Sequence, residues 1–141
     1  MNAGYSGTPL AKKLGLKDGQ AVAFVGLPAS VSHLLSDRAY REVESVDNWV
    51  ELSDKLYDVV HLFSKEADVI RKAVHELADR IVQTGMIWVS WPKKASKVQT
   101  DVTEDVVREA ALRGKLVDVK VGAVDSVWSG LKLVIRKDLR Q

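Results

Sequence analysis

The chain has 141 residues, 46% of them hydrophobic, which suits one globular domain with a single buried core. Its 21 basic and 19 acidic residues leave a net charge of +2, so an electropositive surface must come from clustered side chains, and general coating of nucleic acid is disfavoured. The absence of cysteine excludes disulfides, thiol nucleophiles and thiolate metal sites. No apolar run has the length of a signal-peptide core or a membrane span, so we expect a cytoplasmic protein without a membrane partner.

The beginning of the chain differs in composition from the rest. Four of the nine glycines and Pro9 lie within residues 1–19, which predicts an irregular N-terminal arm. Within it, Leu10, Leu14 and Leu16 can anchor a short helical turn on the remainder of the protein. We therefore expect an arm at residues 1–19 and a single α/β domain at residues 20–141.

Four segments in the first two thirds of the chain have strand patterns. Two are near-continuous apolar runs, as in central strands covered on both faces, and one of the other two is weak. The predicted strands cover residues 20–27, 40–46, 57–63 and 86–91.

Helix signals follow the first three of these strands. Pro28 can open a helix in its first turn, and Asp47 is a plausible N-cap for a short second helix. Ser64 can cap the third helix, in which apolar residues recur at spacings of three and four from Ile70 to Val82. Gly85 is expected to stop that helix.

The last third begins with a helix and ends with two strands. Asp101 and Glu104 form an acidic variant of the capping box for the helix. Apolar and polar residues then alternate in residues 116–124 and 128–135, as in strands with one wetter face. The connection at residues 125–127 is too short for a helical crossover, so the two strands are predicted to form an antiparallel hairpin.

This order predicts an open α/β sheet of mostly parallel strands, with helices on both faces, right-handed crossovers and a C-terminal antiparallel hairpin. The pattern resembles the Rossmann-type domain of class I methyltransferases, which also ends on such a hairpin, although the chain is short by about one strand and one helix. The resemblance implies S-adenosylmethionine as a cofactor. It also implies a glycine-rich loop after the first strand, where this chain has Gly26, Leu27 and Pro28, and an acidic residue at the end of the second strand, for which Glu42 and Glu44 are loose candidates.

A second resemblance lies in the sequence itself. Four phrases, GYSGTPLAKKLG, WVSWPKKAS, TEDVVRE and VDSVWSGLKLVIR, occupy residues 4–15, 88–96, 103–109 and 124–136. Together and in this order they are similar to a bacterial family of domains of unknown function, whose members are small single-domain proteins. This resemblance implies a family and yields little about function, because the family is uncharacterised.

A basic loop follows the fourth strand. In open α/β sheets the ligand crevice lies beyond the carboxyl ends of the parallel strands, and the next helix N-terminus also favours anions. The loop could therefore bind a phosphate or carboxylate, with help from the arm and from an aromatic ring at the strand's end. The alternative is a solvated loop, because no glycine is present to form a close anion cradle. The candidate residues are Lys12, Lys13, Trp91, Lys93, Lys94 and Lys97.

The remaining side chains suggest packing. Trp88 and Trp91 are three apart on one strand, so they should point to opposite faces, where core packing is their simplest role. His33, His61 and His75 lie on separate predicted elements without metal-ligand spacing. No catalytic set and no metal site emerge from the sequence.

The preferred interpretation is a non-catalytic Rossmann-like module without a cofactor that binds a protein partner or a small anionic ligand. The alternative is a small S-adenosylmethionine-dependent methyltransferase-like enzyme. Nucleic-acid binding is less favoured because the charge is nearly balanced. A homodimer that covers the exposed edge of the terminal hairpin is a further expectation.

Overall fold

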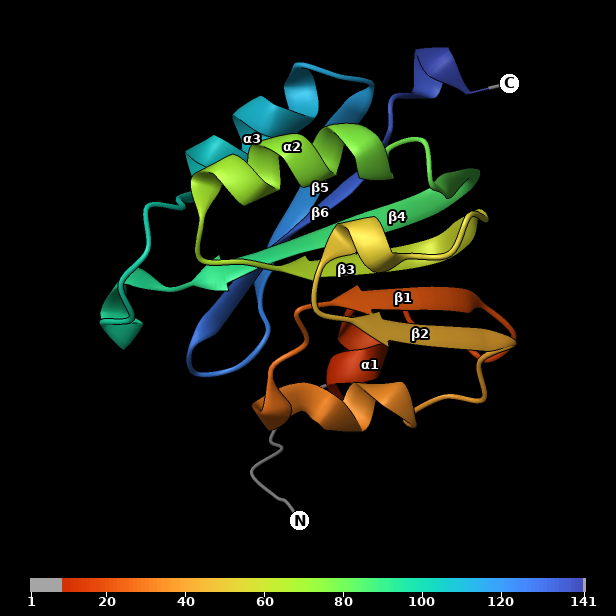
Figure 1. The fold of residues 1–141 in the computed structure, drawn as a ribbon, viewed down its shortest axis with the longest axis horizontal. Helices are drawn as coiled ribbons and strands as arrows, with labels where there is room; N and C mark the ends of the chain where they lie inside the picture. Colours follow the sequence, from red (N-terminus) through yellow and green to blue (C-terminus); the bar gives the residue numbers. More distant parts are fainter. Residues whose placement is uncertain (1–8, 141) are drawn as a thin grey trace.

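The computed structural model describes residues 9–140 and contains a six-stranded sheet in the order β2-β1-β3-β4-β6-β5 (Figure 1). The first four strands in this order are parallel, and β6 runs antiparallel to both β4 and β5. The predicted fold class, the parallel portion and the terminal hairpin are therefore confirmed. The strands are β1 (Ala21–Val25), β2 (Glu42–Val46), β3 (Tyr57–Phe63), β4 (Ile81–Pro92), β5 (Leu116–Ala123) and β6 (Trp128–Ile135).

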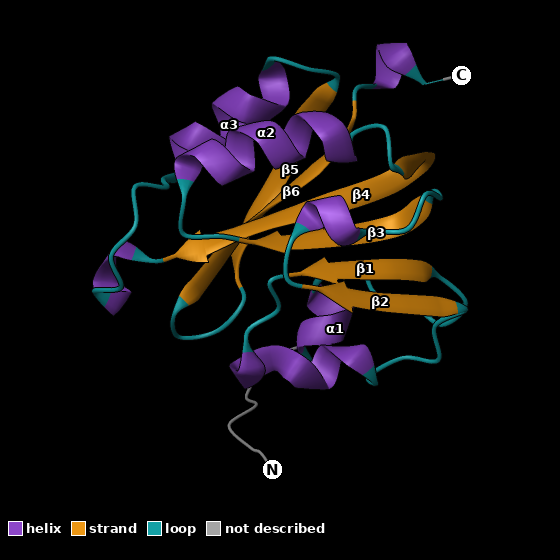
Figure 2. Ribbon diagram, viewed as in Figure 1, coloured by secondary structure: helices purple, strands orange, loops and turns teal. Residues whose placement is uncertain are grey.

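Helices cover both faces of the sheet. Figure 2 shows α2 and α3 on one face, and α1 with the neighbouring short helix η1 on the other. Among residues 9–140 there is no helix of the length and apolar character needed to cross a bilayer. The α-helices are α1 (Leu10–Lys13), α2 (Ala67–Leu77) and α3 (Glu104–Leu112), and the 3₁₀ helices are η1 (Ala29–Leu35), η2 (Trp49–Glu51), η3 (Lys94–Ser96) and η4 (Lys137–Leu139).

Two apolar cores lie on the two faces of the sheet. In β1, Ala21 and Ala23 join the core under α2 and α3, while Val22 and Phe24 join the core under α1 and η1. Burial on both faces explains why this strand is a continuous apolar run. Trp91 lies in the first core and Trp88 in the second, which confirms that the two rings point to opposite faces.

The described part of the predicted arm contributes to the second core. Leu14 and Leu16 are buried there, and the Trp88 indole N–H donates a 2.9 Å hydrogen bond to the Leu14 carbonyl. The first part of the phrase at residues 4–15 lies outside the described residues. The boundary between an arm and a domain at residue 19 stays a prediction.

Helix α2, the third helix predicted from the sequence, is shorter than its apolar periodicity predicts. It ends at Leu77, and β4 begins at Ile81, which pairs with Tyr57 of β3. The expectation that the helix continues to Gly85 is wrong, because Ile81 is buried equally well as a strand residue. A Cβ on Gly85 would lie 3.0 Å from the Asp58 carbonyl oxygen, where the pairing of β3 with β4 shifts register. Gly85 thus marks a strand irregularity with close backbone approach.

Two predicted helix caps are displaced by one or two residues. The N-cap of η2 is Asn48, whose side chain accepts from the Val50 amide at 3.1 Å, and Asp47 precedes it. The N-cap of α3 is Thr103, and Asp101 serves a different helix, as described below. These shifts leave the Asp47 carboxylate outside the helix.

The N-terminus of α2 also differs from expectation. Its N-cap residue is Glu66, which makes no side-chain cap hydrogen bond. The Ser64 hydroxyl instead accepts from the Glu66 amide at 3.1 Å, so Ser64 shapes the turn between β3 and α2 without capping the helix.

Candidate functional site

A cavity of about 390 Å³ lies at the carboxyl ends of β1, β2 and β3. Parallel strands bring their carboxyl ends to the same edge of a sheet, which is where open α/β folds bind ligands. The cavity is therefore in the position that the fold favours. It is lined by Val25, Gly26, Pro28, Asp47, Asn48, Trp49, Leu62, Phe63, Ser64, Lys65, Glu66, Val69 and Trp128.

Gly26 makes the turn that opens the cavity after β1. Its φ of +69° is in the left-handed region, and a Cβ there would lie 2.8 Å from the Phe63 carbonyl oxygen. Its amide donates a 2.8 Å hydrogen bond to the Val46 carbonyl of β2. Only glycine fits both the backbone conformation and the space at this point. The three strand ends around the cavity are thus held together at Gly26.

Asp47 places a carboxylate at the rim of the cavity. It follows Val46, the last residue of β2, and no hydrogen bond or ion pair of its side chain is found in the part of the chain that the structure describes. The amides of η2 are served by Asn48, so Asp47 is not used as a cap. It follows Gly26 by about 20 residues, the separation at which an acidic residue of a nucleotide-binding α/β unit reaches ribose hydroxyls.

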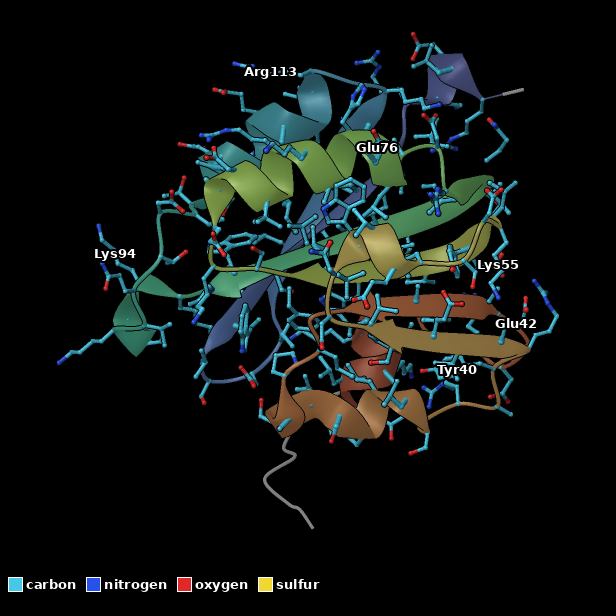
Figure 3. The ribbon with its side chains drawn as sticks, viewed as in Figure 1. Tyr40, Glu42, Lys55, Glu76, Lys94 and Arg113 are labelled. Carbon is cyan, nitrogen blue, oxygen red and sulfur yellow. The ribbon has the colours of Figure 1, made fainter. Side chains whose placement is uncertain are left out.

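Glu42 and Glu44, the acidic residues considered from the sequence, lie within β2 and not at its carboxyl end. Glu42 pairs with Lys55 at 2.9 Å, and both are labelled near the end of the sheet opposite to Lys94 in Figure 3. The Glu44 carboxylate accepts from the hydroxyls of Ser53 and Tyr57. Neither glutamate lines the cavity.

The electrostatics of Glu44 fit a structural role. Burial acts to raise the pKa of this carboxyl, but hydrogen bonds from Ser53 and Tyr57 outweigh it, so the net pKa is lowered. The pKa of the Tyr57 hydroxyl is raised by burial and by the Glu44 carboxylate. Glu44 is therefore a charged acceptor that ties β2 to the start of β3.

Aromatic residues form part of the cavity wall. Phe63 and Trp128 both line it, with ring centroids 5.4 Å apart in an edge-to-face arrangement. Behind Phe63, the His61 ring stacks at 4.1 Å and shares a 2.7 Å hydrogen bond with the Ser90 hydroxyl. Burial lowers the pKa of His61 to about 3. His61 is therefore a neutral, fixed support for the aromatic wall at physiological pH.

The cavity lining contains charges of both signs. Asp47 and Glu66 oppose one lysine, Lys65. The first amide of α2, that of Ala67, donates a 2.8 Å hydrogen bond to the Asp101 carboxylate. An anion at this helix N-terminus would compete with Asp101 for the same donor. The lining is consequently better suited to hydroxyls and to a neutral or zwitterionic ligand than to a phosphate.

The lysines predicted from the sequence lie elsewhere. Lys94 and Lys97 are exposed and Lys93 is half-buried, all on or beside η3, and Figure 3 shows Lys94 projecting away from the sheet. Their ammonium groups make no hydrogen bond or ion pair within residues 9–140. The structure thus gathers these three on one loop, outside the cavity lining.

The other three predicted site residues, Lys12, Lys13 and Trp91, lie outside the basic loop and make different contacts. Lys12 and Lys13 are exposed on α1, which packs on the second face, and the Lys13 ammonium donates a 2.7 Å hydrogen bond to the Ala123 carbonyl. Trp91 is buried in the first core. None of the three lines the cavity. Within the described residues no group of three or more histidine, cysteine or acidic side chains is arranged to hold a metal ion.

Two residues of the cavity, Asp47 and Trp128, are not among the site residues predicted from the sequence. The sequence predicts Asp47 as a helix cap, and the signal that could have identified it is its position directly after a strand, where open α/β folds bind ligands. For Trp128 the sequence holds no local signal, because nothing in it indicates that β6 inserts beside β4 and brings its first residue to the cavity.

Solved structures with similar folds include several methyltransferases at low sequence identity. One is magnesium protoporphyrin IX methyltransferase from Synechocystis PCC 6803 with bound SAH (TM-score 0.66, 12% identity, covering 90% of this chain and 80% of that one). A second is a SAM-dependent methyltransferase from Aquifex aeolicus (TM-score 0.65, 16% identity, 90% and 88%). A third is a TehB-like SAM-dependent methyltransferase from Corynebacterium glutamicum (TM-score 0.64, 12% identity, 90% and 85%). At these identities the likeness establishes the methyltransferase-type Rossmann-like fold.

The search of curated proteins gave no match. The family model described as "Protein of unknown function (DUF3052)" matches residues 11–137, which include nearly all of the domain and three of the four phrases in full. The chain belongs to this family.

Proposed function

We propose that the chain is a small-molecule binding module whose cavity holds the adenosyl group of S-adenosylmethionine or of S-adenosylhomocysteine. The observation that carries the proposal is the cavity of about 390 Å³ at the ends of three parallel strands, with Asp47 at its rim and without a partner among residues 9–140. This volume is within the usual range of about 300–1,000 Å³ for small-molecule sites. The ligands named in the similar structures support the choice of nucleoside.

The chemistry of the two walls supports the same ligand class. Trp49 and Trp128, which are both half-buried in the lining, offer aromatic surface on which a purine can pack. The Asp47 carboxylate is an acceptor for ribose hydroxyls. Because the lining has two carboxylates and one ammonium group, a triphosphate is disfavoured relative to a zwitterionic amino-acid nucleoside.

The proposed function is binding of the adenosyl group without methyl transfer. The segment after β1 has Leu27 and Pro28 in place of a glycine-rich loop, and Pro28 lacks the amide that such a loop would point at a ligand. A methyltransferase-like enzyme is the second candidate, supported by the similarity of fold. Incubation with S-adenosylmethionine labelled in the methyl group, together with small-molecule, RNA and protein acceptors, separates the two: transferred label would favour the enzyme.

Isothermal titration calorimetry tests the binding proposal. We expect S-adenosylhomocysteine to bind with a dissociation constant below about 1 mM and more tightly than ATP. Asp47→Ala should weaken binding by about tenfold or more, because a charged acceptor for ribose hydroxyls is lost. Asp54→Ala is the matched control, since Asp54 is exposed and does not line the cavity. Absence of binding to the wild-type protein, or equal effects of the two substitutions, would contradict the proposal.

The basic loop supports a separate, weaker proposal, anion binding by Lys93, Lys94 and Lys97. The supporting observation is that three ammonium groups without partners in residues 9–140 share one loop. Thermal-shift measurements with sulfate and acidic metabolites test it, with the triple lysine-to-serine variant as the comparison. Equal shifts in the two proteins, or no shift in either, would remove this function. The additional roles for Lys12, Lys13 and Trp91 belong to the same proposal.

A further inference from the structure

Three segments that are far apart in the sequence meet at the turn between β5 and β6. The turn comprises residues 124–127. The Ser30 hydroxyl of η1 donates a 2.9 Å hydrogen bond to the Asp125 carboxylate, and the Lys93 amide donates a 2.7 Å hydrogen bond to the Val127 carbonyl. The turn is thus tied both to the segment after β1 and to the start of the basic loop.

Asp125 organises the turn itself. One oxygen of its carboxylate accepts from the amides of Val127 and Trp128, each at 2.8 Å, while the other oxygen accepts from Ser30. A carboxylate that receives three hydrogen bonds from fixed donors also fixes the direction of those donors. The backbone of Trp128 is therefore held from both sides, because its carbonyl accepts from the Val124 amide at 2.8 Å.

The hydrogen bond between Ser30 and Asp125 joins the chain near Pro28 to the chain near Trp128, and Pro28 and Trp128 both line the cavity. Pro28 is two residues before Ser30, and Trp128 is three residues after Asp125. The hydrogen bond between Ser30 and Asp125 consequently couples the β1 side of the cavity to its aromatic wall. Among the described residues no other side-chain hydrogen bond joins η1 to the hairpin turn.

We propose that Asp125 is a positioning residue that sets the place of the Trp128 ring in the binding cavity, with Ser30 holding Asp125 to the β1 side. The inference rests on the proposed function for the meaning of the cavity, but the placement of Trp128 can be measured without a ligand. Asp125 touches no ligand in this account. It acts through the Trp128 backbone and through the Ser30 hydroxyl.

The experiment uses the full chain and two readouts. In the ligand-free protein, the Trp128 indole resonance in ¹H–¹⁵N NMR, assigned with Trp128→Phe, reports the surroundings of the ring. In titrations with S-adenosylhomocysteine, the dissociation constant reports the affinity of the cavity for its ligand. The variants are Asp125→Asn, Ser30→Ala and Ser30→Thr, with Ser126→Ala as a control on the same turn, since Ser126 is exposed and its side chain makes no hydrogen bond within residues 9–140.

We expect Asp125→Asn and Ser30→Ala to shift or broaden the Trp128 indole resonance, while Ser30→Thr, which retains the hydroxyl, and Ser126→Ala leave it in place. Affinity for S-adenosylhomocysteine should fall about tenfold in Asp125→Asn and by a factor of about three in Ser30→Ala, since the first loses bonds to a charged group and the second loses one exposed bond. The Trp88 indole, which is bonded to the Leu14 carbonyl, should not move and serves as a check on folding.

An unchanged Trp128 resonance in both Asp125→Asn and Ser30→Ala overturns the inference, whatever the ligand does. A wild-type protein that fails to bind S-adenosylhomocysteine overturns the proposed function, and the indole shifts then decide the positioning role by themselves. If Asp125→Asn moves the Trp88 resonance as well, Ser30→Ala, which leaves the turn's own hydrogen bonds intact, decides the question.

Discussion

The Asp101 carboxylate accepts a 2.8 Å hydrogen bond from the Ala67 amide, so a residue that precedes α3 in the sequence caps the N-terminus of α2. Beside it, the Thr100 hydroxyl donates a 2.6 Å hydrogen bond to the Lys65 carbonyl. The loop between β4 and α3 is therefore fastened to the turn that forms one side of the cavity. The basic loop and the cavity are mechanically connected even though the lysines do not line the cavity.

The caps made by Asp101 and Thr103 predict two separate local effects. Asp101→Ala should destabilise the protein by about 1 kcal/mol and speed hydrogen exchange at Ala67 of α2. Thr103→Ala, which removes the hydrogen bond to the Val106 amide, should cost a similar amount but speed exchange at Val106 of α3. Hydrogen exchange followed by NMR checks both. Faster exchange in the first turn of α3 alone, in the Asp101 variant, would show that Asp101 caps its own helix.

Gly26 provides a test of the cavity's backbone. Gly26→Ala should destabilise the protein by about 2–4 kcal/mol, because an alanine at φ +69° is strained and its Cβ would meet the Phe63 carbonyl oxygen. Gly19→Ala is the matched control: φ is +83°, but no atom lies within 4 Å of the added Cβ, so only the backbone strain of about 1 kcal/mol remains. Urea unfolding measures both. Equal costs for the two substitutions would contradict the close approach of β1 and β3.

A second glycine pair tests the packing behind the aromatic wall. Gly122 of β5 and Gly130 of β6 are directly paired. A Cβ on Gly130 would lie 3.2 Å from both the Ser90 hydroxyl oxygen and the Trp88 ring, so Gly130→Ala should cost about 1–3 kcal/mol. A Cβ on Gly122 would meet only the flexible Lys13 side chain at 3.6 Å, so Gly122→Ala should be near neutral. Thermal unfolding of the two variants distinguishes them, and the reverse order would be inconsistent with this register.

His61 predicts a dependence of stability on pH. Its pKa falls from 6.5 in the unfolded chain to about 3 in the folded one because of burial. Between these values the unfolded state binds a proton that the folded state does not. The free energy of unfolding should therefore fall as pH falls through this window, by up to about 1.4 kcal/mol per pH unit, and this contribution should be constant above pH 6.5.

Urea unfolding between pH 7 and pH 4 checks the prediction by comparing the slope for the wild type with that for His61→Gln. His75→Gln is the control, because His75 is exposed on α2. The free energy of unfolding should depend less steeply on pH in His61→Gln than in the wild type or in His75→Gln. Identical slopes in all three would indicate that His61 is protonated in the folded state.

The strands and their faces could be predicted from the sequence, because burial on both sides leaves continuous apolar runs such as Ala21–Val25. The end of α2 could not. The apolar residue Ile81 satisfies the helical period and the strand pairing with Tyr57 equally well, so tertiary pairing decides. Local signals identify an element with more certainty than its boundary.

The candidate site could be predicted in outline. A cavity does lie at the carboxyl ends of the parallel strands, the edge at which the fold class predicts a ligand crevice. The residues that line this cavity differ from the lysines predicted from the sequence. Asp47 is available to the cavity because Asn48 caps η2, and Trp128 reaches it because β6 inserts beside β4. The sequence contains lysines in one conspicuous loop, whereas the cavity is lined by residues from four separate parts of the chain, within 25–28, 47–49 and 62–69 and at 128.

The edge of the sheet bears on the predicted homodimer. β5 is the outer strand, and its pairing with β6 shifts register between Asp118 and Lys120. An irregularity on an edge strand hinders further strand pairing. A homodimer that uses this edge therefore stays a prediction, for which sedimentation equilibrium is the measurement.

NMR titration of the ¹⁵N-labelled chain with S-adenosylhomocysteine tests the binding account most directly, because it reports where the ligand lies as well as whether it binds. The account predicts saturable shifts at the amides of Gly26, Asp47 and Ser64 and at the Trp128 indole, with little change at Lys94 and Lys97. Shifts confined to the loop around Lys94, or no shifts at millimolar ligand, would contradict it.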